Sequence, residues 1–298
     1  MAHEHHHHDH GATIDSLNKA FIIGIAINAL YVIIEAVAGF AYGSIGLLSD
    51  AGHNLGDTAS LILALIAFKL AHLKANNKYT YGYKKSTILV SLVNAVILLV
   101  EVGIIIAESI EKFFNPQAIE GDVIAWVAGA GVIVNAFTAW LFMKDKEKDL
   151  NVKGAYLHMA MDALVSVGVV ISGIVINYTG WYVIDPIIGL IVACIITVST
   201  WNLLHDSLRL SLDGVPSGID LKQIEKIICS DEGVKSCHHL HVWAISTTQN
   251  ALTVHIVPSS IDKMETIKER IKKNLLKANI SHSTLEFEQS DSHCDEHC

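Results

Sequence analysis

Two pairs of a histidine and an aspartate are the positions at which this sequence could do chemistry. His53 and Asp57 form the first pair, and His158 and Asp162 form the second. Residues four positions apart lie on one face of a helix, so each pair would present an imidazole beside a carboxylate. Four such nitrogen and oxygen ligands, brought together, suit a tetrahedral Zn²⁺ ion. The spacing therefore predicts a shared His2Asp2 zinc site.

Both pairs lie inside long apolar segments of the chain. Ionisable groups at bilayer depth each cost roughly 2.5–3.5 kcal/mol, and they are rare there unless they serve a function. The alternative is that the two pairs are unrelated and only hydrogen-bond neighbouring helices together. That alternative explains one such pair more easily than two identical ones.

The composition is that of a membrane protein with a soluble part. Of the 298 residues, 51% are hydrophobic and 17% are charged, whereas soluble domains have roughly 25% charged residues. The formal net charge of −9 argues against nucleic acid as a partner, because binding to phosphate backbones needs a basic surface. The five cysteines are odd in number and do not favour a disulfide framework. We expect no cleaved signal peptide, because the first residues are polar.

Six hydrophobic segments are each long enough to cross about 30 Å of hydrocarbon. The loops between the second and third and between the fourth and fifth segments are rich in lysine, which predicts that they face the cytoplasm. An even number of spans places both termini there too, and we expect the membrane to be a bacterial inner membrane. Reduced cysteines fit that compartment. The predicted spans are 17–40, 45–71, 86–111, 121–143, 152–177 and 182–207.

Several of these spans carry polar residues in their interior. We expect most of them to face the helix bundle or a watery cavity, because lipid cannot satisfy them. They are Asn28, Glu35, Asn94, Glu101 and Asn135.

The N-terminal segment 1–16 is predicted to be a disordered cytosolic tail. Six of its first ten residues are histidine, and His-rich tracts bind metal loosely. An expression tag is the alternative origin of these histidines.

After the last span the composition becomes charged, and helical and strand-like patterns alternate. This order predicts an α+β, ferredoxin-like domain, αββαβ, with both helices on one face of the sheet. The chain then divides into the tail 1–16, a six-helix transmembrane domain 17–207 and a cytosolic domain 208–298. The expected elements of the last domain are helices at 218–230 and 260–278 and strands at 234–247, 251–258 and 283–289.

The sequence resembles the cation diffusion facilitator family of zinc transporters over nearly its whole length. The resemblance implies six spans, a cytosolic metallochaperone-like domain, a homodimer and proton-coupled export of the metal. It implies a secondary transporter and not an enzyme. The motifs that carry it are Ser49-Asp50-Ala51-Gly52-His53-Asn54-Leu55-Gly56-Asp57, His158-Met159-Ala160-Met161-Asp162, Leu212-Asp213-Gly214-Val215-Pro216 and His239-Leu240-His241-Val242-Trp243.

The resemblance also implies roles for single residues in the spans. His53, Asp57, His158 and Asp162 stand where the family's transport ligands lie. Relatives with aspartate at the position of His53 also handle cadmium, whereas the histidine version looks more zinc-selective. Lys85 and Asp213 match a basic and an acidic residue that pair in the family, although Lys85 is alternatively a simple cytoplasmic-side charge. In the loop between spans two and three, Tyr83 stands near a metal-binding histidine of some relatives, so we expect no such site here.

In the soluble domain, the resemblance implies that zinc is a regulatory ligand as well as the cargo. Three histidines, His238, His255 and His282, match family positions that bind zinc at the dimer interface. Glu288, Cys294 and Cys298 match a further ligand set. Three residues, Asp295-Glu296-His297, separate the two cysteines, where relatives often have two. For His239 and His241 we favour ordinary strand positions.

The proposed ligands also suggest how transport would work. Metal binding needs neutral imidazole and ionised carboxylate, so it releases protons, and two alternating conformations would give Zn²⁺/H⁺ exchange. An intramembrane metalloenzyme is a poorer alternative, because it needs an open coordination position and a general base, and no His-Glu-x-x-His occurs. A membrane-anchored metal sensor or storage protein without transport is the remaining alternative.

Overall fold

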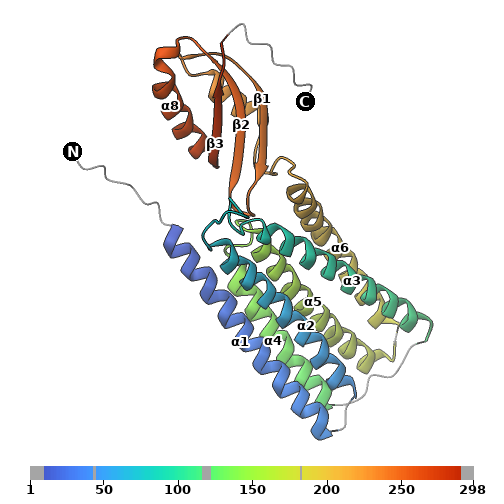
Figure 1. Cartoon of the computed structure of the whole chain (residues 1–298). Coiled ribbons are helices and arrows are strands. Elements are labelled where there is room, and N and C mark those ends of the chain that lie inside the picture. The colour runs from blue at the N-terminus through green and yellow to red at the C-terminus, as the bar shows by residue number, and fades with distance from the viewer. Residues whose placement is uncertain (1–9, 43–44, 116–121, 182, 290–298) are drawn as a thin grey trace. The chain divides into compact units, whose positions relative to one another are not determined.

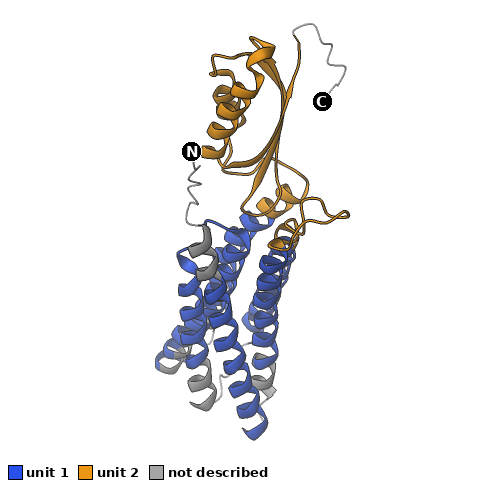
Figure 2. Ribbon diagram, turned by 60° about the vertical axis from the view of Figure 1, so that its left-hand side comes forward, with its two compact units in different colours: residues 1–70, 90–204 blue, residues 71–89, 205–298 orange. Residues whose placement is uncertain are grey.

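The computed structural model describes residues 10–42, 45–115, 122–181 and 183–289. The chain forms two compact units (Figure 2), which we call the helical unit and the α+β unit. The helical unit comprises Met1–Leu70 and Val90–Leu204, and the α+β unit comprises Ala71–Leu89 and His205–Cys298. The α+β unit therefore takes in a loop that lies between two predicted spans, in addition to the predicted domain 208–298.

Six long helices account for most of the described part of the chain before residue 212 (Figure 1), as the sequence predicts. Within the described residues, four stretches are long and apolar enough to cross a membrane: Asn18–Ala41, Ala51–Ala71, Ser86–Phe114 and Pro186–Ser211. A shorter apolar stretch, Gly129–Met143, lies in the fourth helix. The helices are α1 (His10–Tyr42), α2 (Ile45–Ala71), α3 (Ser86–Phe114), α4 (Asp122–Met143), α5 (Leu150–Thr179) and α6 (Ile184–Ser211).

Helix α5 is packed on two sides inside the helical unit. Met159 belongs to a buried cluster with residues of α1, α2 and α4, such as Phe21, Leu61 and Phe142. Met161, two residues further on, belongs to a second cluster with α3 and α6 residues. His158 and Asp162 flank these two methionines on the same helix and are buried with them.

The outer faces of the helices carry many large apolar side chains that are exposed. Phe40, Ile33 and Val198 are examples, each more than half accessible. Many exposed apolar side chains are expected where a helix faces lipid, since lipid tails replace the protein core as the apolar solvent.

The α+β unit contains a three-stranded sheet in the order β1-β2-β3. Strand β1 is antiparallel to β2, and β2 is parallel to β3. The predicted order αββαβ is confirmed, with β3 beginning earlier than predicted because the chain turns at Asn279, which has a φ of 63°. The elements are α7 (Leu221–Cys229), β1 (Val234–Ala244), β2 (Asn250–Pro258), a 3-10 turn (Ile261–Lys263), α8 (Met264–Lys277) and β3 (Ile280–Phe287).

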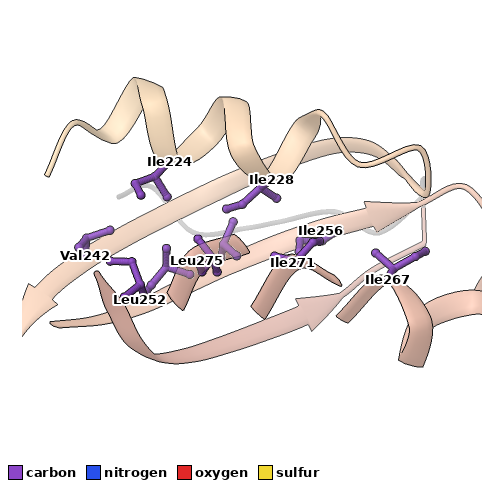
Figure 3. Packing of buried hydrophobic residues seen from close by; sticks show 10 residues of the cluster. Ile224, Ile228, Val242, Leu252, Ile256, Ile267, Ile271 and Leu275 are labelled. Atoms are coloured by element: carbon purple, nitrogen blue, oxygen red, sulfur yellow. The ribbon is translucent and has the colours of Figure 1, made fainter. Parts of the chain in front are cut away.

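Both helices pack on one face of this sheet, as the sequence predicts (Figure 3). Ile228 of α7 and Ile271 of α8 meet Leu252 and Ile256 of β2, and all four are fully buried. Fully burying a side chain of this size stabilises the fold by roughly 1.5–3 kcal/mol. Because side chains alternate along a strand, His255 points to the opposite face of β2.

The end of α6 is closed by a left-handed turn. The amide of Gly214 donates to the Arg209 carbonyl at 2.8 Å, and Asp213 has a φ of 58°. A Cβ at Gly214 would lie 2.9 Å from that carbonyl oxygen, so the turn needs glycine there. Asp213 Oδ1 lies 2.5 Å from Lys85 Nζ, which confirms the pairing that the resemblance implies.

Candidate metal centre

Helix α2 supplies one half of a polar cluster inside the helical unit. His53 and Asp57 are one helical turn apart, and His53 Nε2 lies 3.8 Å from Asp57 Oδ2. The Asp57 side chain is 1% exposed, whereas that of His53 is 47% exposed. The pair therefore reaches from the surface of the unit to its interior.

Helix α5 supplies the other half. His158 Nε2 lies 2.7 Å from Asp57 Oδ1, and Asp162 Oδ1 lies 3.8 Å from His53 Nε2. Both α5 side chains are buried. The structure thus brings together the four ligands that the spacing predicts, with Asp57 in contact with both histidines.

A fifth group, Glu101 of α3, joins the cluster from the side of His158. Its Oε2 lies 3.3 Å from His158 Nδ1. Sequence reasoning expected Glu101 to face the bundle but did not include it among the ligands. It is the only charged residue between Ser86 and Ala107, which is the signal that could have indicated a role in the site.

The donor atoms form two overlapping sets. In each set, one atom from each of three side chains lies within 4.8 Å of the other two. The first set is His53, Asp57 and Asp162, and the second is Asp57, Glu101 and His158. Since Asp57 belongs to both, a cation bound at either set would contact it.

Three carboxylate oxygens in the cluster, Asp57 Oδ2, Glu101 Oε2 and Asp162 Oδ2, are buried without a hydrogen-bond partner among the described residues. An unsatisfied buried carboxylate oxygen is costly, and a bound cation removes that cost. The donors are imidazole nitrogens and carboxylate oxygens, which suit zinc and similar divalent ions. The chemistry of the donor set therefore fits a divalent metal.

The distances indicate how the site would change on binding metal. Tetrahedral bonds of roughly 2.0–2.1 Å separate neighbouring ligand atoms by about 3.3 Å. The two contacts of His53, at 3.8 Å, are close to that value. The contact between His158 and Asp57, at 2.7 Å, is shorter, because the atoms share a hydrogen bond. A metal ion would have to break this bond and take its proton's place.

A buried polar network holds α2 beside α1 at this level. Asn54, which follows His53, donates to Glu35 Oε2 at 2.8 Å, and the Tyr31 hydroxyl donates to Glu35 Oε1 at 2.9 Å. Both oxygens of the buried Glu35 carboxylate thus have a donor. The network fixes the rotation of α2, and with it the direction of His53 and Asp57.

A very small cavity adjoins His158. Its volume is about 10 Å³, which is about the room that one water molecule needs. Ser60 and Asn94 are among its lining residues, and the others are Leu61, Leu98, Gly154 and Ala155. The cavity beside His158 is therefore no larger than one water molecule.

The α+β unit has a separate cluster on the open face of its sheet. His238 and His255 are directly paired across β1 and β2. Glu288 Oε1 lies 2.6 Å from His255 Nδ1, and Glu288 Oε2 lies 3.2 Å from His238 Nε2. One donor atom from each of the three lies within 4.8 Å of the others.

His282 is not part of this three-residue cluster. It is exposed on β3, where its ring meets that of Tyr81 edge-on at 5.5 Å between centroids. It also lines a cavity of about 590 Å³ that includes His72, Lys74 and Lys84. The two remaining predicted ligands, Cys294 and Cys298, lie outside the described residues, as does the histidine run of the N-terminal tail.

The neighbouring histidines of β1 differ from one another. His241 pairs with Thr253 in the ladder, as expected for a strand residue. His239 does not occupy an ordinary strand position, because it has a φ of 50° at an irregularity between His238 and His241. Its ring stacks on that of His255 at 5.2 Å. The bulge therefore brings a third imidazole to the cluster.

Comparison with known families gives two matches that together cover most of the chain. A family model described as the cation efflux transmembrane domain matches residues 21–210. A second, described as the cytoplasmic domain of cation efflux proteins, matches residues 216–289.

Individual relatives match over nearly their whole lengths. A cadmium, cobalt and zinc/H(+)-K(+) antiporter of Bacillus subtilis is 38% identical, over 95% of this chain and 91% of the relative. Zinc transporter ZitB of Escherichia coli is 33% identical, over 98% of this chain and 94% of the relative. The metal cation efflux system protein CzcD of Cupriavidus metallidurans is 37% identical, over 95% of this chain and 89% of the relative.

Proposed function

Since the chain belongs to the cation efflux family, whose members are integral membrane transporters and not enzymes, we propose that it exchanges Zn²⁺ for protons. The direction is export from the cytoplasm, and the transport site is the cluster of His53, Asp57, His158 and Asp162. The name of the Bacillus subtilis relative gives cadmium, cobalt and zinc together with H⁺ and K⁺, and that of the Escherichia coli relative gives zinc.

The observation that carries this proposal is the convergence of His53, His158 and Asp162 on Asp57 inside the helical unit. Two aspartate oxygens there are buried and lack a hydrogen-bond partner among the described residues. A dication would supply the missing charge partner, and two carboxylates would offset its charge. Such a cluster at bilayer depth is costly unless it serves the passage of an ion.

The hydrogen bond between His158 and Asp57 supplies the link between metal and proton. At 2.7 Å, the imidazole N–H donates to the carboxylate, so a proton occupies the space between two metal ligands. Zn²⁺ needs the lone pair of that nitrogen and the charge of that oxygen, so the proton must leave when metal binds. Returning protons re-form the bond and expel the metal. Exchange then requires two conformations that open the site to opposite sides of the membrane.

The α+β unit has a regulatory role in this proposal. His238, His255 and Glu288 would bind cytosolic zinc, with His282, Cys294 and Cys298 as the remaining candidate ligands. Among the described residues, no helix of the α+β unit packs on the sheet face that carries these groups, and this face would pair with the same face of a second copy. Both termini are in the cytoplasm, and the membrane is a bacterial inner membrane.

Transport by the purified chain in sealed vesicles tests this function. Zinc uptake and internal pH are recorded together while a zinc or proton gradient is applied. Asp162→Asn keeps the shape of the side chain but removes its charge, so both signals should fall to background. Glu108→Gln, a change at an exposed carboxylate of α3, should leave both unchanged.

Two results would contradict the proposal. Transport at the wild-type rate by Asp162→Asn would show that the ion does not pass through this cluster. Zinc binding by the wild type without any flux would favour a membrane-anchored sensor or store.

A further inference from the structure

We propose that Cys229 and Cys237 form a reversible dithiol–disulfide site in the α+β unit. Both are free cysteines, and their sulfur atoms lie 2.7 Å apart. That separation exceeds the length of an S–S bond by only about 0.7 Å. The third free cysteine among the described residues, Cys194, belongs to the helical unit.

Two elements of the same hydrophobic core hold the pair in place. Cys229 is the last residue of α7, and Cys237 lies on β1 opposite Ile256 of β2. Ile228, beside Cys229, is fully buried in the core that also contains Ile256. The thiols are therefore brought together by the packing of α7 on the sheet, and a bond between them needs little movement.

The connection between the two cysteines is itself fixed. The Asp231 carboxylate accepts hydrogen bonds from Arg270 Nε at 2.8 Å and Nη2 at 2.6 Å, and another from the Gly233 amide at 2.9 Å. A Cβ at Gly233 would lie 2.4 Å from Ile267 Cγ1, so the turn packs directly on α8. A fixed connection lowers the entropy that a disulfide would otherwise have to remove.

The accessibility of the two sulfurs sets the order of the reaction. Cys229 is exposed and Cys237 is half-buried, so a soluble disulfide such as oxidised glutathione meets Cys229 first. The Cys229 thiolate attacks that disulfide, forms a mixed disulfide and releases one glutathione thiolate. Cys237 then attacks the Cys229 sulfur and displaces the second glutathione. Two protein thiols thereby lose two protons and two electrons, and one oxidised glutathione becomes two reduced molecules.

The bond would also affect the neighbouring zinc ligands, a consequence that rests on the proposed function. Cys237 precedes His238 on β1, and His238 is paired with His255. A disulfide would tie this end of β1 to α7 and restrict the adjustment of His238 around a metal ion. Zinc affinity at His238, His255 and Glu288 should then differ between the reduced and oxidised protein.

Mass spectrometry of the full chain in detergent tests the site itself. The protein is freed of metal with a chelator, equilibrated with mixtures of reduced and oxidised glutathione, alkylated and digested. We expect one linked peptide pair, containing Cys229 and Cys237, which disappears when reductant is added. Cys194→Ser and the double change Cys294→Ser with Cys298→Ser should leave it unchanged, whereas Cys229→Ser and Cys237→Ala should each remove it.

Separate recovery of the two cysteines would overturn the proposal. Suppose that glutathione leaves the melting temperature of the wild-type protein unchanged, and that Cys229 and Cys237 are recovered separately alkylated or glutathionylated. If this holds at every ratio of reduced to oxidised glutathione, the site does not exist. Zinc titration of the oxidised and reduced forms tests the coupling, with Cys229→Ser as the control that should not respond to glutathione. Equal zinc affinity in the two forms would overturn the coupling and would leave Zn²⁺/H⁺ exchange unaffected.

Discussion

His158 Nε2 lies 2.7 Å from Asp57 Oδ1, although 101 positions separate the two residues in the chain. The contact joins one histidine–aspartate pair to the other across α5 and α2. It also places a proton between two atoms that would both bind a metal ion. The same contact therefore stabilises the metal-free arrangement and explains why cargo and proton would compete.

Replacing His53 by aspartate tests the selectivity of the transport site. The variant keeps four ligands but exchanges a neutral nitrogen for an anionic oxygen, and a more negative site should discriminate less against larger cations. We expect His53→Asp to keep zinc transport and to gain cadmium transport, measured as the ratio of the two fluxes in vesicles. His205→Asp, at an exposed histidine of α6, is the control. An unchanged ratio would mean that His53 does not set selectivity.

Glu101 should tune the site without being essential to it. Its carboxylate lies beside His158 Nδ1, so it can orient the imidazole whose other nitrogen would bind metal. Loss of such a supporting partner typically costs about 10–100-fold in metal affinity. Glu101→Gln should therefore raise the zinc concentration for half-maximal transport by about that factor and leave some maximal transport. Complete inactivity of a folded Glu101→Gln protein would instead make Glu101 a required ligand, and Glu108→Gln again serves as the control.

The histidines of the sheet should affect regulation and not conduction. Replacing His238 and His255 by alanine should remove zinc bound by the α+β unit and raise the zinc concentration needed for half-maximal transport. Transport at saturating zinc should persist, because the bundle ligands are intact. His241→Ala, at an exposed position of the same strand, is the matched control. A folded double variant that transports no zinc at any concentration would refute this assignment.

The pair of Lys85 and Asp213 combines a salt bridge with an unfavourable backbone conformation. Both side chains are largely exposed, so the ion pair should contribute about 0.2–1 kcal/mol. Asp213 also has a φ of 58°, which glycine adopts more easily. Asp213→Gly should consequently lower the melting temperature less than Asp213→Ala does. The same difference in melting temperature between Asp213→Gly and Asp213→Ala should appear when Lys85 is also replaced by alanine. If it disappears there, the backbone conformation of Asp213 is not its cause.

Asp231 should give the α+β unit a stability that depends on pH. The Arg270 guanidinium beside it, helped by the Gly233 amide, holds the pKa of this carboxyl below its ordinary value. The folded form is then favoured when the group is ionised, so the contribution is present above about pH 4 and is lost as the pH falls through the lowered pKa. Asp231→Asn should speed hydrogen exchange of the segment 230–244 at pH 7, and this effect should shrink in acid. An equal effect at both pH values would exclude ionisation as the cause, and Asp262→Asn is the surface control.

Local spacing made much of this structure predictable. The i, i+4 repeat places His53 with Asp57 and His158 with Asp162 on single helix faces, wherever the helices lie. The alternation of Leu252, Val254 and Ile256 with Thr253 and His255 similarly indicates which face of β2 is buried. These features depend on the geometry of one element at a time.

Features that depend on how elements rotate against one another were not predictable. The position of Glu101 beside His158 requires the rotation of α3 about its axis, which periodicity does not specify. Glu288, and not His282, completes the three-residue cluster with His238 and His255 because β3 ends beside β2 at that point. The approach of Cys229 to Cys237 follows from the packing of α7 on the sheet, and neither residue's local sequence indicates it.

The α+β unit is assembled from two separated parts of the chain, Ala71–Leu89 and His205–Cys298. During synthesis, the first part leaves the ribosome long before the second exists. At roughly 5–20 residues per second, making Val90–Leu204 takes on the order of ten seconds. Over that interval Lys85 cannot meet Asp213, and Tyr81 cannot meet His282. The α+β unit can therefore complete its fold only after all the spans have been translated. A chain that ends before His205 cannot form this unit.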